Sequence, residues 1–250
     1  MLTSERHQFI LSELKDKGVV KVQALTESLA TSESTIRRDL AQLEAEHLLR
    51  RVHGGAERVE QKNFELTMTE KESKHMKEKR AIASYAASLI CEDDCIFIDA
   101  GTTTLQLIEA LPQKKITIVT NGIRHMQLAT EKGFETYIVG GRAKSATGAI
   151  VGRAAQKSLQ QYRFDKSFIG TNGIDAHAQF TTPDPDEALI KELAHTLANE
   201  TYVLADASKF NHVFFTQMFA LSEANIITNQ LNEETSQIYH SLTNVKEVGK

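Results

Sequence analysis

The sequence of 250 residues has two cysteines, three prolines and no tryptophan, and each scarcity excludes a class of protein. The two cysteines, Cys91 and Cys95, exclude a disulfide-rich scaffold and leave no zinc-binding spacing, so we expect buried thiols and no bound metal. No apolar run approaches the roughly 20 residues of a membrane span. The polar N-terminal residues lack the pattern of a secretory signal. We therefore predict a cytoplasmic protein that does not enter a membrane.

An excess of positive charge is also missing. The formal net charge is −4, which gives no global field that attracts nucleic acid. Residues 1–58 carry nine Lys or Arg and nine Asp or Glu. Any DNA binding must therefore depend on the local arrangement of a few side chains.

The chain is long enough for about two domains, and its apolar pattern changes along its length. Residues 1–58 have the pattern of short helices, whereas short apolar runs alternate with helical sequence from about residue 95. Residues 60–80 are polar, tolerate helix and contain no proline. We predict a DNA-binding domain at 1–58, a helical connector at 59–80 and an α/β domain at 81–250.

The apolar spacing of the N-terminal domain predicts three helices. Ser32 is well placed to cap the third helix through its hydroxyl. Ser34 and Arg38 lie nearly opposite the apolar stripe of that helix, with Thr35 and Arg37 beside the stripe. Short hydroxyls and arginines at the start of a helix are typical of major-groove recognition. The apolar positions are Ile10, Leu11 and Leu14 in the first helix, Val22, Leu25 and Leu29 in the second, and Ile36, Leu40 and Leu43 in the third.

Residues 48–56 predict a strand followed by a glycine turn, which is a wing that brings basic side chains to the DNA backbone. An ordinary three-helix bundle with a solvated polar face is the alternative, and the balanced charge supports it. The order of short helix, short turn, capped helix and basic hairpin favours a winged helix-turn-helix. The predicted DNA-contacting residues are Ser32, Ser34, Thr35, Arg37, Arg38, Arg50, Arg51 and His53.

Two phrases of this domain, SESTIRRDL at 32–40 and RVHGGA at 51–56, resemble the DNA-binding domain of DeoR-type bacterial transcriptional repressors. Further phrases are similar to the sensor domain of that family, and the whole is most similar to its fructose-operon repressors. The resemblance implies a repressor of a sugar-utilisation operon that is released from DNA by a phosphorylated sugar, with fructose 1-phosphate as inducer. The sensor phrases are DAGTTT at 99–104, VTN at 119–121, FIGTNG at 168–173, TTPD at 181–184 and ADASKF at 205–210.

The C-terminal domain is predicted to be a doubly wound α/β fold. Five short β-rich runs are mostly followed by small or polar residues and then by helical sequence, which indicates a parallel sheet. In such sheets ligands bind outside the carboxyl ends of the strands. The runs lie at 95–98, 116–119, 136–139, 167–169 and 202–205.

Residues 101–104 could hold a phosphate group, because a glycine, free helix amides and threonine hydroxyls suit an oxyanion. A threonine-capped helix without a ligand is an equally ordinary explanation. Lys209 could supply the countercharge, whereas Lys71 and Lys79 are expected to be solvated rather than to reach the same edge. The predicted effector-binding residues are Asp99, Gly101, Thr102, Thr103, Thr104, Asn121, Gly141, Asn172, Glu187, Asp206 and Lys209.

The C-terminal domain also resembles ribose-5-phosphate isomerase and glucosamine-6-phosphate deaminase in fold, which implies a residual phosphosugar isomerase as the alternative function. Glu187 aligns with the isomerase base, but GTNG at 170–173 replaces its paired-aspartate loop. Asn172 and Glu187 then become candidate ligands for sugar hydroxyls, although Glu187 is equally explained as an acid favoured by the helix dipole. We expect no enzyme activity, no catalytic residue and no cofactor.

The expected partner is double-stranded operator DNA. A single DNA-binding domain of this size buries too little surface for tight specific binding, and operators are commonly palindromic or repeated. We therefore expect a homodimer or homotetramer.

Overall fold

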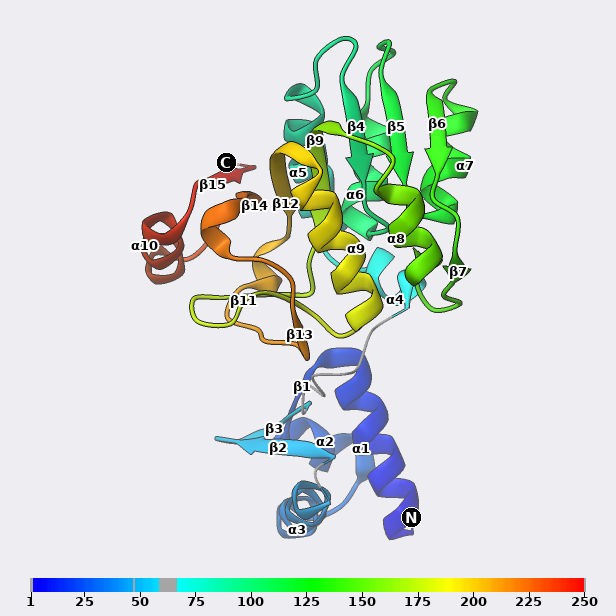
Figure 1. The fold of residues 1–250 in the computed structure, drawn as a ribbon. Helices are drawn as coiled ribbons and strands as arrows, with labels where there is room; N and C mark the ends of the chain where they lie inside the picture. The colour runs from blue at the N-terminus through cyan, green and yellow to red at the C-terminus, as the bar shows by residue number, and fades with distance from the viewer. Residues whose placement is uncertain (1, 47, 59–66, 250) are drawn as a thin grey trace. The chain divides into compact units, whose positions relative to one another are not determined.

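The computed structural model describes residues 2–46, 48–58 and 67–249 (Figure 1). The chain divides into two compact units, Met1–Gln61 and Lys62–Lys250, which we call the head and the body. Of the predicted connector, residues 59–66 lie outside the described residues, and the remainder contains two helical segments. None of the helices in the described ranges is long and apolar enough to cross a membrane.

The head is a three-helix unit with a small antiparallel sheet of order β1-β3-β2. The apolar residues predicted for the three helices form one buried cluster, with Leu11 packed against it from a partly buried position. Leu49 and Ala56 of the wing complete this core. The elements are α1 (Thr3–Lys17), β1 (Val19–Lys21), α2 (Val22–Leu29), α3 (Glu33–Ala45), β2 (Leu49–Val52) and β3 (Gly55–Arg58).

Two glycines shape the wing. Gly54 has φ +79° in the turn between β2 and β3, a conformation that residues with a side chain rarely adopt. A Cβ atom at Gly55 would lie 2.0 Å from the carbonyl oxygen of Val20 on β1. Glycine at position 55 therefore allows β1 to pair with β3, a pairing that the sequence did not predict.

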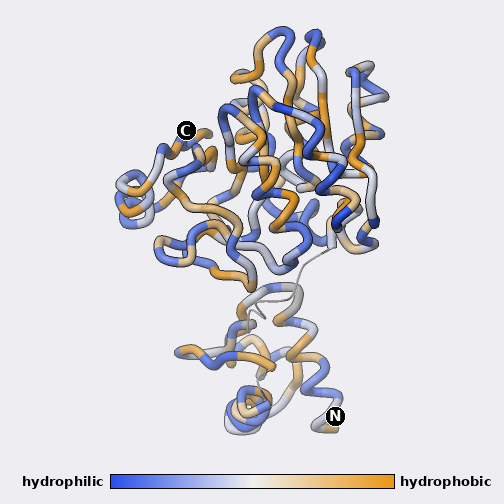
Figure 2. The backbone as a smooth tube through the Cα atoms, in the orientation of Figure 1, coloured by the Kyte–Doolittle hydropathy of each residue, from blue (hydrophilic) through white to orange (hydrophobic). Residues whose placement is uncertain are grey.

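The body is built around a parallel sheet of seven strands in the order β15-β14-β12-β9-β4-β5-β6. The predicted doubly wound α/β fold is confirmed, and each of the five predicted runs lies in or overlaps one of its strands. The apolar strands are visible as orange segments in Figure 2. The strands are β4 (Cys95–Ile98), β5 (Thr117–Thr120), β6 (Glu135–Ile138), β9 (Phe164–Gly170), β12 (Ala198–Leu204), β14 (Asn225–Asn229) and β15 (Val245–Val248).

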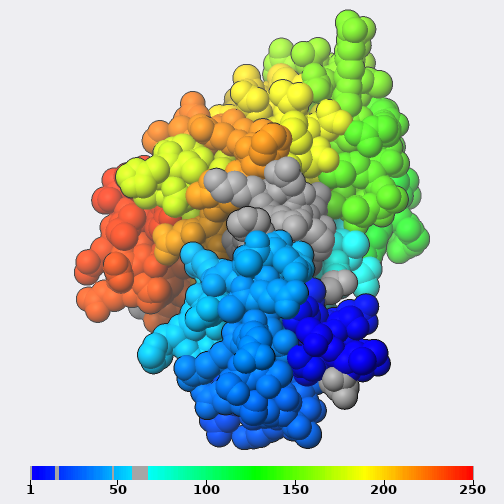
Figure 3. Space-filling model, turned by 90° about the horizontal axis from the view of Figure 1, so that it is seen from below, coloured from blue at the N-terminus to red at the C-terminus, as the bar shows by residue number. Residues whose placement is uncertain are grey.

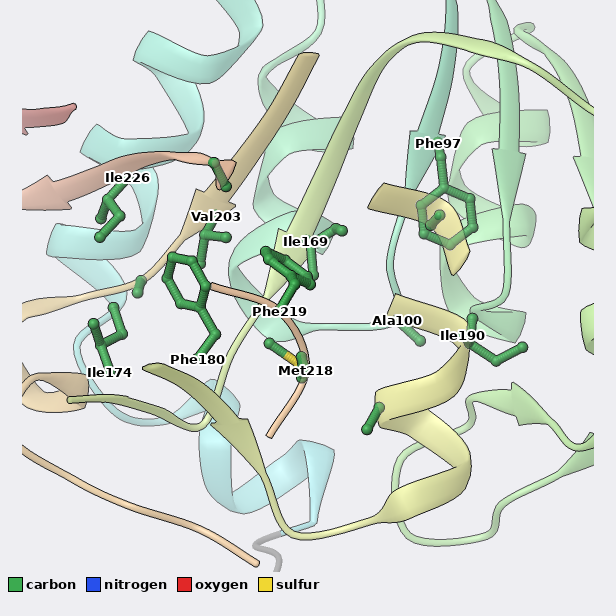
Figure 4. Close-up of a cluster of buried hydrophobic side chains, with 14 of the residues drawn as sticks. Phe97, Ala100, Ile169, Ile174, Phe180, Ile190, Val203, Met218, Phe219 and Ile226 are labelled. Carbon is green, nitrogen blue, oxygen red and sulfur yellow. The ribbon is translucent and has the colours of Figure 1, made fainter. Parts of the chain in front are cut away.

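Helices cover both faces of this sheet because successive side chains of a strand point to opposite sides. Phe97 of β4 belongs to one buried cluster, and its neighbours Ile96 and Ile98 belong to the other. Figure 4 shows Phe97 of β4 and Ile190 of α9, both members of the first cluster. The cluster of α9 also includes α8 (Arg153–Leu159) and α10 (Glu233–Leu242), with α9 at Pro185–Thr196, and the opposite cluster includes α5 (Met76–Ser88), α6 (Thr102–Ala110) and α7 (Ile123–Glu131).

Smaller elements lie at the ends of the sheet strands. Two further short 3-10 turns span Ala207–Lys209 and Leu221–Glu223. Strands β7 and β8 form an antiparallel hairpin, and β10, β11 and β13 form a second small sheet. The bounds are α4 (Met68–Glu72), β7 (Arg142–Ala143), β8 (Ile150–Val151), β10 (Gly173–Asp175), β11 (Gln179–Thr182) and β13 (Thr216–Gln217).

The direction in which the chain adds strands reverses beside β4. The chain places β5 and then β6 on one side of β4, and it later places β9 on the other side. Ligands of doubly wound sheets bind outside the carboxyl ends of the strands at such a reversal. The residues that follow β4 and β9 are therefore the natural position for a binding site.

The prediction of buried thiols is wrong. Cys91 and Cys95 are both exposed. They flank the turn at the amino edge of the sheet, where Cys95 is the exposed first residue of β4 and burial begins only at Ile96.

Candidate functional site

The exposed face of α3 carries the side chains predicted to contact DNA. The Ser32 hydroxyl accepts a hydrogen bond from the backbone N–H of Thr35 at 3.3 Å, as a helix cap does. Ser34, Arg37 and Arg38 are exposed, opposite the buried stripe of the helix. In the space-filling view of Figure 3, the blue part of the head that contains α3 lies at the surface. This face is free of the head's own core and can meet a DNA groove.

A partly buried ion pair fixes α3 to α1. Asp39 accepts hydrogen bonds from the Arg6 guanidinium at 2.7 and 3.0 Å. Burial raises the pKa of Asp39, but the hydrogen bonds and charge of Arg6 outweigh this effect and leave the pKa below its usual value. The carboxylate therefore stays ionised and holds the recognition helix in a defined orientation.

Three of the four arginines that are predicted to contact DNA already form ion pairs with glutamates of the head. Arg37 donates to Glu33 through Nε at 3.1 Å, and the guanidinium of Arg50 pairs with Glu57 across the wing. The guanidinium of Arg51 lies 3.8 Å from a carboxylate oxygen of Glu44.

Arg38 differs from these three arginines, because no hydrogen bond or ion pair engages it within the described residues. His53 is exposed in the wing turn. DNA phosphates would have to replace glutamates at three arginines, whereas Arg38 is available as it stands. The DNA-contacting roles of these residues stay predictions.

A buried ion pair lies at the strand reversal of the body. Asp99 follows β4 and is 1% exposed, and its carboxylate pairs with the ammonium of Lys191 on α9, which is 5% exposed. Lys191 also donates to the carbonyl of Gly170 at 3.0 Å, and the N–H of Gly170 donates to Asp99 at 3.0 Å. This network joins the ends of β4 and β9 to α9. Asp99 therefore has a partner within the protein as well as its predicted role toward an effector.

The loop at residues 101–104 forms the start of α6. A Cβ atom at Gly101 would lie 3.8 Å from the Cα atom of Gly170, so the two strand ends approach closely here. The buried Thr104 hydroxyl donates to the carbonyl of Asp99 at 2.6 Å and accepts from the N–H of Gly101 at 2.9 Å. Thr104 thus shapes the loop. The first-turn amides, which have no partner within a helix, are the groups able to hold a phosphate.

His125 of α7 lies beneath this loop. Its Nε2 atom is 2.9 Å from the carbonyl oxygen of Gly101 and 3.2 Å from the Thr104 hydroxyl. The side chain is 1% exposed, and burial lowers its pKa to about 4. The imidazole is therefore neutral near pH 7, and the geometry assigns its proton to Nε2, which donates to Gly101. A Cβ atom at Gly122 would lie 2.4 Å from the ring, so glycine there makes room for it.

Two other predicted effector residues lie on the β5 and β7 side of the reversal. The buried Asn121 side chain accepts a hydrogen bond from the N–H of Ala100 at 2.9 Å and so ties the end of β5 to the end of β4. Gly141 is exposed just before β7. A Cβ atom at Gly141 would lie 2.9 Å from the carbonyl oxygen of Val151. Both positions therefore have a structural reason in addition to their predicted role.

Glu187, in the first turn of α9, is also committed to protein contacts. It is 5% exposed and accepts from the ammonium of Lys144 at 2.7 Å and from the Thr147 hydroxyl at 2.9 Å. Asn172 accepts a hydrogen bond from Thr182 at 3.1 Å. The Glu187 carboxylate is therefore held by a cation, and position 172 carries an amide and no carboxylate.

The expectation that Lys79 is solvated is wrong. Lys79 is 4% exposed because it extends the buried stripe of α5 to the carboxyl edge of the sheet. Its ammonium donates to the carbonyl of Lys71. Burial lowers the pKa of Lys79 to about 8, with the nearby charge of Asp206 opposing this and those of Lys209 and Lys71 adding to it. Lys79, Asp206 and Lys209 therefore lie within electrostatic reach of one another at the end of β12.

Asp206 also has a local structural role. Its buried carboxylate accepts from the N–H of Ser208 at 3.0 Å and so caps the short turn that carries Lys209. Across the described ranges, no group of three or more His, Cys, Asp or Glu side chains is placed to hold a metal ion.

Both units match models of known protein families. A model of the DeoR C-terminal sensor domain matches residues 74–230, and a model of the DeoR-like helix-turn-helix domain matches residues 6–62. The chain belongs to the DeoR family. It is a DeoR-family transcriptional regulator in which the DNA-binding domain precedes the sensor domain.

Relatives of this DeoR-family chain match it along nearly their whole length. It is 48% identical to the uncharacterized HTH-type transcriptional regulator FruR of Bacillus subtilis (strain 168) over 249 residues, 99% of each chain. It is 36% identical to the regulator GlpR of Haloferax volcanii, covering 90% of this chain and 89% of GlpR. It is 33% identical to the lactose phosphotransferase system repressor of Staphylococcus aureus, covering 92% and 93%.

Similar solved structures include an enzyme and a regulator. Ribose 5-phosphate isomerase A from Neisseria gonorrhoeae matches with a TM-score of 0.38 at 20% identity, over 53% of this chain and 52% of the isomerase. The sorbitol operon regulator SorC from Klebsiella pneumoniae matches with a TM-score of 0.42 at 10% identity, over 94% and 99%.

Three residues that contact the predicted effector-binding residues were missed from the sequence: Lys191, Lys144 and His125. A lysine within the apolar stripe of α9, between Ile190 and Ala194, was a usable signal for Lys191. Lys144 and His125 gave no such signal, because their partners are 43 and 21–24 residues distant in the chain.

Proposed function

We propose that this DeoR-family regulator represses a fructose-utilisation operon and leaves its operator when it binds fructose 1-phosphate. In this proposal residues 1–58 bind DNA, residues 59–80 connect, and residues 81–250 sense the sugar phosphate. The observation that carries the DNA-binding part is the exposed Ser34 and Arg38 face on a capped helix whose other face is the core of the head. Repression accords with the name of the related Staphylococcus repressor.

Three features at the carboxyl edge of the sheet support a phosphorylated effector. The amide groups at the start of α6 favour an anion, and they lie at the strand reversal where doubly wound sheets bind ligands. Lys79 and Lys209 add positive charge at the neighbouring strand end. The sugar is taken as fructose from the resemblance to fructose-operon repressors and the name of the related FruR.

Glu187 and Asn172 favour sensing over catalysis. Aldose–ketose isomerisation needs a carboxylate that is able to exchange a proton with the substrate. Glu187 is instead paired with Lys144, and position 172 offers an amide. We therefore expect these side chains to bind hydroxyl groups and the protein to lack isomerase activity.

The protein is expected to bind its operator as a homodimer or homotetramer. Two α3 helices that enter successive major grooves of a palindromic site double the contacts that one head makes. Analytical ultracentrifugation with and without operator DNA measures this state. A monomer bound to a single half-site would contradict it.

A thermal-shift panel combined with operator release tests the proposal. A ligand at 100 times its dissociation constant stabilises a protein by about 2.7 kcal/mol. We expect this stabilisation, and release of a fluorescent operator, with fructose 1-phosphate. Fructose, fructose 6-phosphate and ribose 5-phosphate are the matched controls for the phosphate, its position and the sugar. If only another sugar of the panel releases the operator, that sugar is the effector instead of fructose 1-phosphate. If none of them releases the operator, sensing of these sugars is refuted.

A further inference from the structure

Helix α4 is the first described helix after the head in the chain. Besides the hydrogen bond from the Lys79 ammonium to the carbonyl of Lys71, one contact at each end of α4 holds it on the carboxyl edge of the body. At its start, the N–H of Met68 donates to the carbonyl of Ala146 at 3.1 Å. At its end, the carboxylate of Glu72 pairs with the guanidinium of Arg124 on α7. These partners lie in different parts of the chain, so each end of α4 is anchored separately.

The loop that holds the start of α4 also contacts Glu187. Ala146 lies in the loop between β7 and β8, and the side chains of Lys144 and Thr147 in the same loop both contact Glu187, at 2.7 and 2.9 Å. A sugar hydroxyl that donates to Glu187 would compete with these two contacts. The position of the loop, and hence of the carbonyl that Met68 uses, would then depend on the ligand.

Arg124, which holds the end of α4, is followed in the chain by a residue that contacts the proposed phosphate loop at residues 101–104. Arg124 contacts Glu72, and the next residue, His125, contacts the carbonyl of Gly101 and the hydroxyl of Thr104. The two side chains share the first turn of α7. A shift of the 101–104 loop on binding phosphate would therefore move the turn that carries Arg124.

We propose that α4 is the output element of the body, held in one of two states by the Glu72–Arg124 ion pair and by the Met68 hydrogen bond. This inference rests on the proposed function, since it names the path by which the bound sugar phosphate acts on the head. An effector shifts the population of DNA-binding molecules only if it binds the two states differently. Contacts that exist in only one state set that difference in effector affinity. Arg124 acts as a positioning residue, because it does not touch the ligand.

Charge reversal tests this assignment. Glu72→Arg and Arg124→Glu each place like charges opposite one another, and the double variant restores an ion pair with its direction reversed. The control is Lys115→Glu, which removes an ion pair to Asp93 with a 2.7 Å contact at the amino edge of the sheet. For each full-length protein we would measure the operator dissociation constant with and without fructose 1-phosphate, and the effector dissociation constant with and without operator.

Each single variant should change the ratio of the two operator constants by about threefold or more, while the double variant and the control stay within about twofold of the wild type. For Arg124→Glu, the effector dissociation constant of the DNA-free protein should change only as far as the populations of the two states change. Glu72→Arg also removes a negative charge that favours the charged form of Lys79. An unchanged ratio in both single variants would overturn the proposal. So would a loss of effector binding that is equal with and without operator, because α4 would then belong to the binding site itself.

The same measurements separate this inference from the proposed function. If fructose 1-phosphate does not release the wild-type protein, the proposed effector is wrong, and the operator constants without effector decide the role of α4. The single variants must then still change operator affinity, with recovery in the double variant. If they do not, the role of α4 fails independently of the effector.

Discussion

Protonation of His125 should destabilise the body in mildly acidic solution. The ordinary pKa of a histidine is 6.5, and burial beneath the 101–104 loop lowers that of His125 to about 4. Between these values the unfolded chain binds a proton that the folded protein does not bind. The free energy of unfolding therefore falls as the pH decreases from about 6.5 toward 4, and it is least affected above 6.5.

The size of this effect follows from the shift. One pKa unit corresponds to 1.36 kcal/mol, so a fall from 6.5 to about 4 amounts to about 3 kcal/mol when the pH reaches 4. Because the side chain is 1% exposed, solvent screening reduces this figure little. His125→Gln keeps an N–H donor near Gly101 and removes the titrating group. The variant should lack this part of the acid sensitivity.

Urea unfolding of both full-length proteins at half-unit steps from pH 4 to pH 7.5 measures the difference. Circular dichroism follows unfolding, and hydrogen exchange in residues 99–110 assigns the effect to the loop. Other titrating groups contribute equally to both proteins and cancel in the difference. The gap between variant and wild type should change by about 3 kcal/mol in favour of the variant from pH 7 to pH 4. A gap that is constant with pH would refute the neutral, buried histidine.

Four further changes test other parts of the molecule. Arg38→Ala should lose about 1–3 kcal/mol on the cognate operator and relax preference at one base position, and equal loss on all sequences of an operator library would instead indicate a phosphate contact. Solvent deuterium should not exchange into ribose or fructose phosphates, and exchange that Glu187→Gln abolishes would establish catalysis. Lys209→Ala should repress but resist induction, with about 1.5–3 kcal/mol lost in fructose 1-phosphate binding, so wild-type sensitivity in operator-release titrations would exclude its role. Gly55→Ala should destabilise the head by about 1–3 kcal/mol in thermal unfolding, because the added carbon meets a backbone oxygen at 2.0 Å, whereas Gly140→Ala, which has open space around it, should not.

The architecture was predictable because it follows from local patterns. Apolar spacing identified the three helices of the head, and the cap at Ser32 marked where α3 begins. Alternation of apolar runs with helical sequence identified the parallel sheet. The edge strand β15, its neighbour β14 and the three-residue strand β1 escaped prediction, since their pairing depends on partners distant in the chain.

The site was less predictable because charge pairing is a property of the folded chain. Polar residues after strands pointed to the carboxyl edge of the sheet, but the charged side chains that pair with them did not follow from spacing. Lys191 reaches Asp99 across 92 positions, and Lys144 reaches Glu187 across 43. Lys79 was judged by the usual exposure of lysine, although its place in the stripe with Ile82, Ala83 and Ala86 indicated burial.

The ion pairs between glutamates and arginines of the head affect how the protein searches genomic DNA for its operator. To contact a phosphate, Arg37, Arg50 or Arg51 would first have to leave its carboxylate, at Glu33, Glu57 or Glu44 respectively. On random DNA no base contacts compensate for this exchange, so the protein should dissociate quickly from it. Residues 1–58, with nine positive and nine negative side chains, should thus spend little time on the wrong sequence. Only a small fraction of the protein molecules in a cell should then be held on DNA other than the operator.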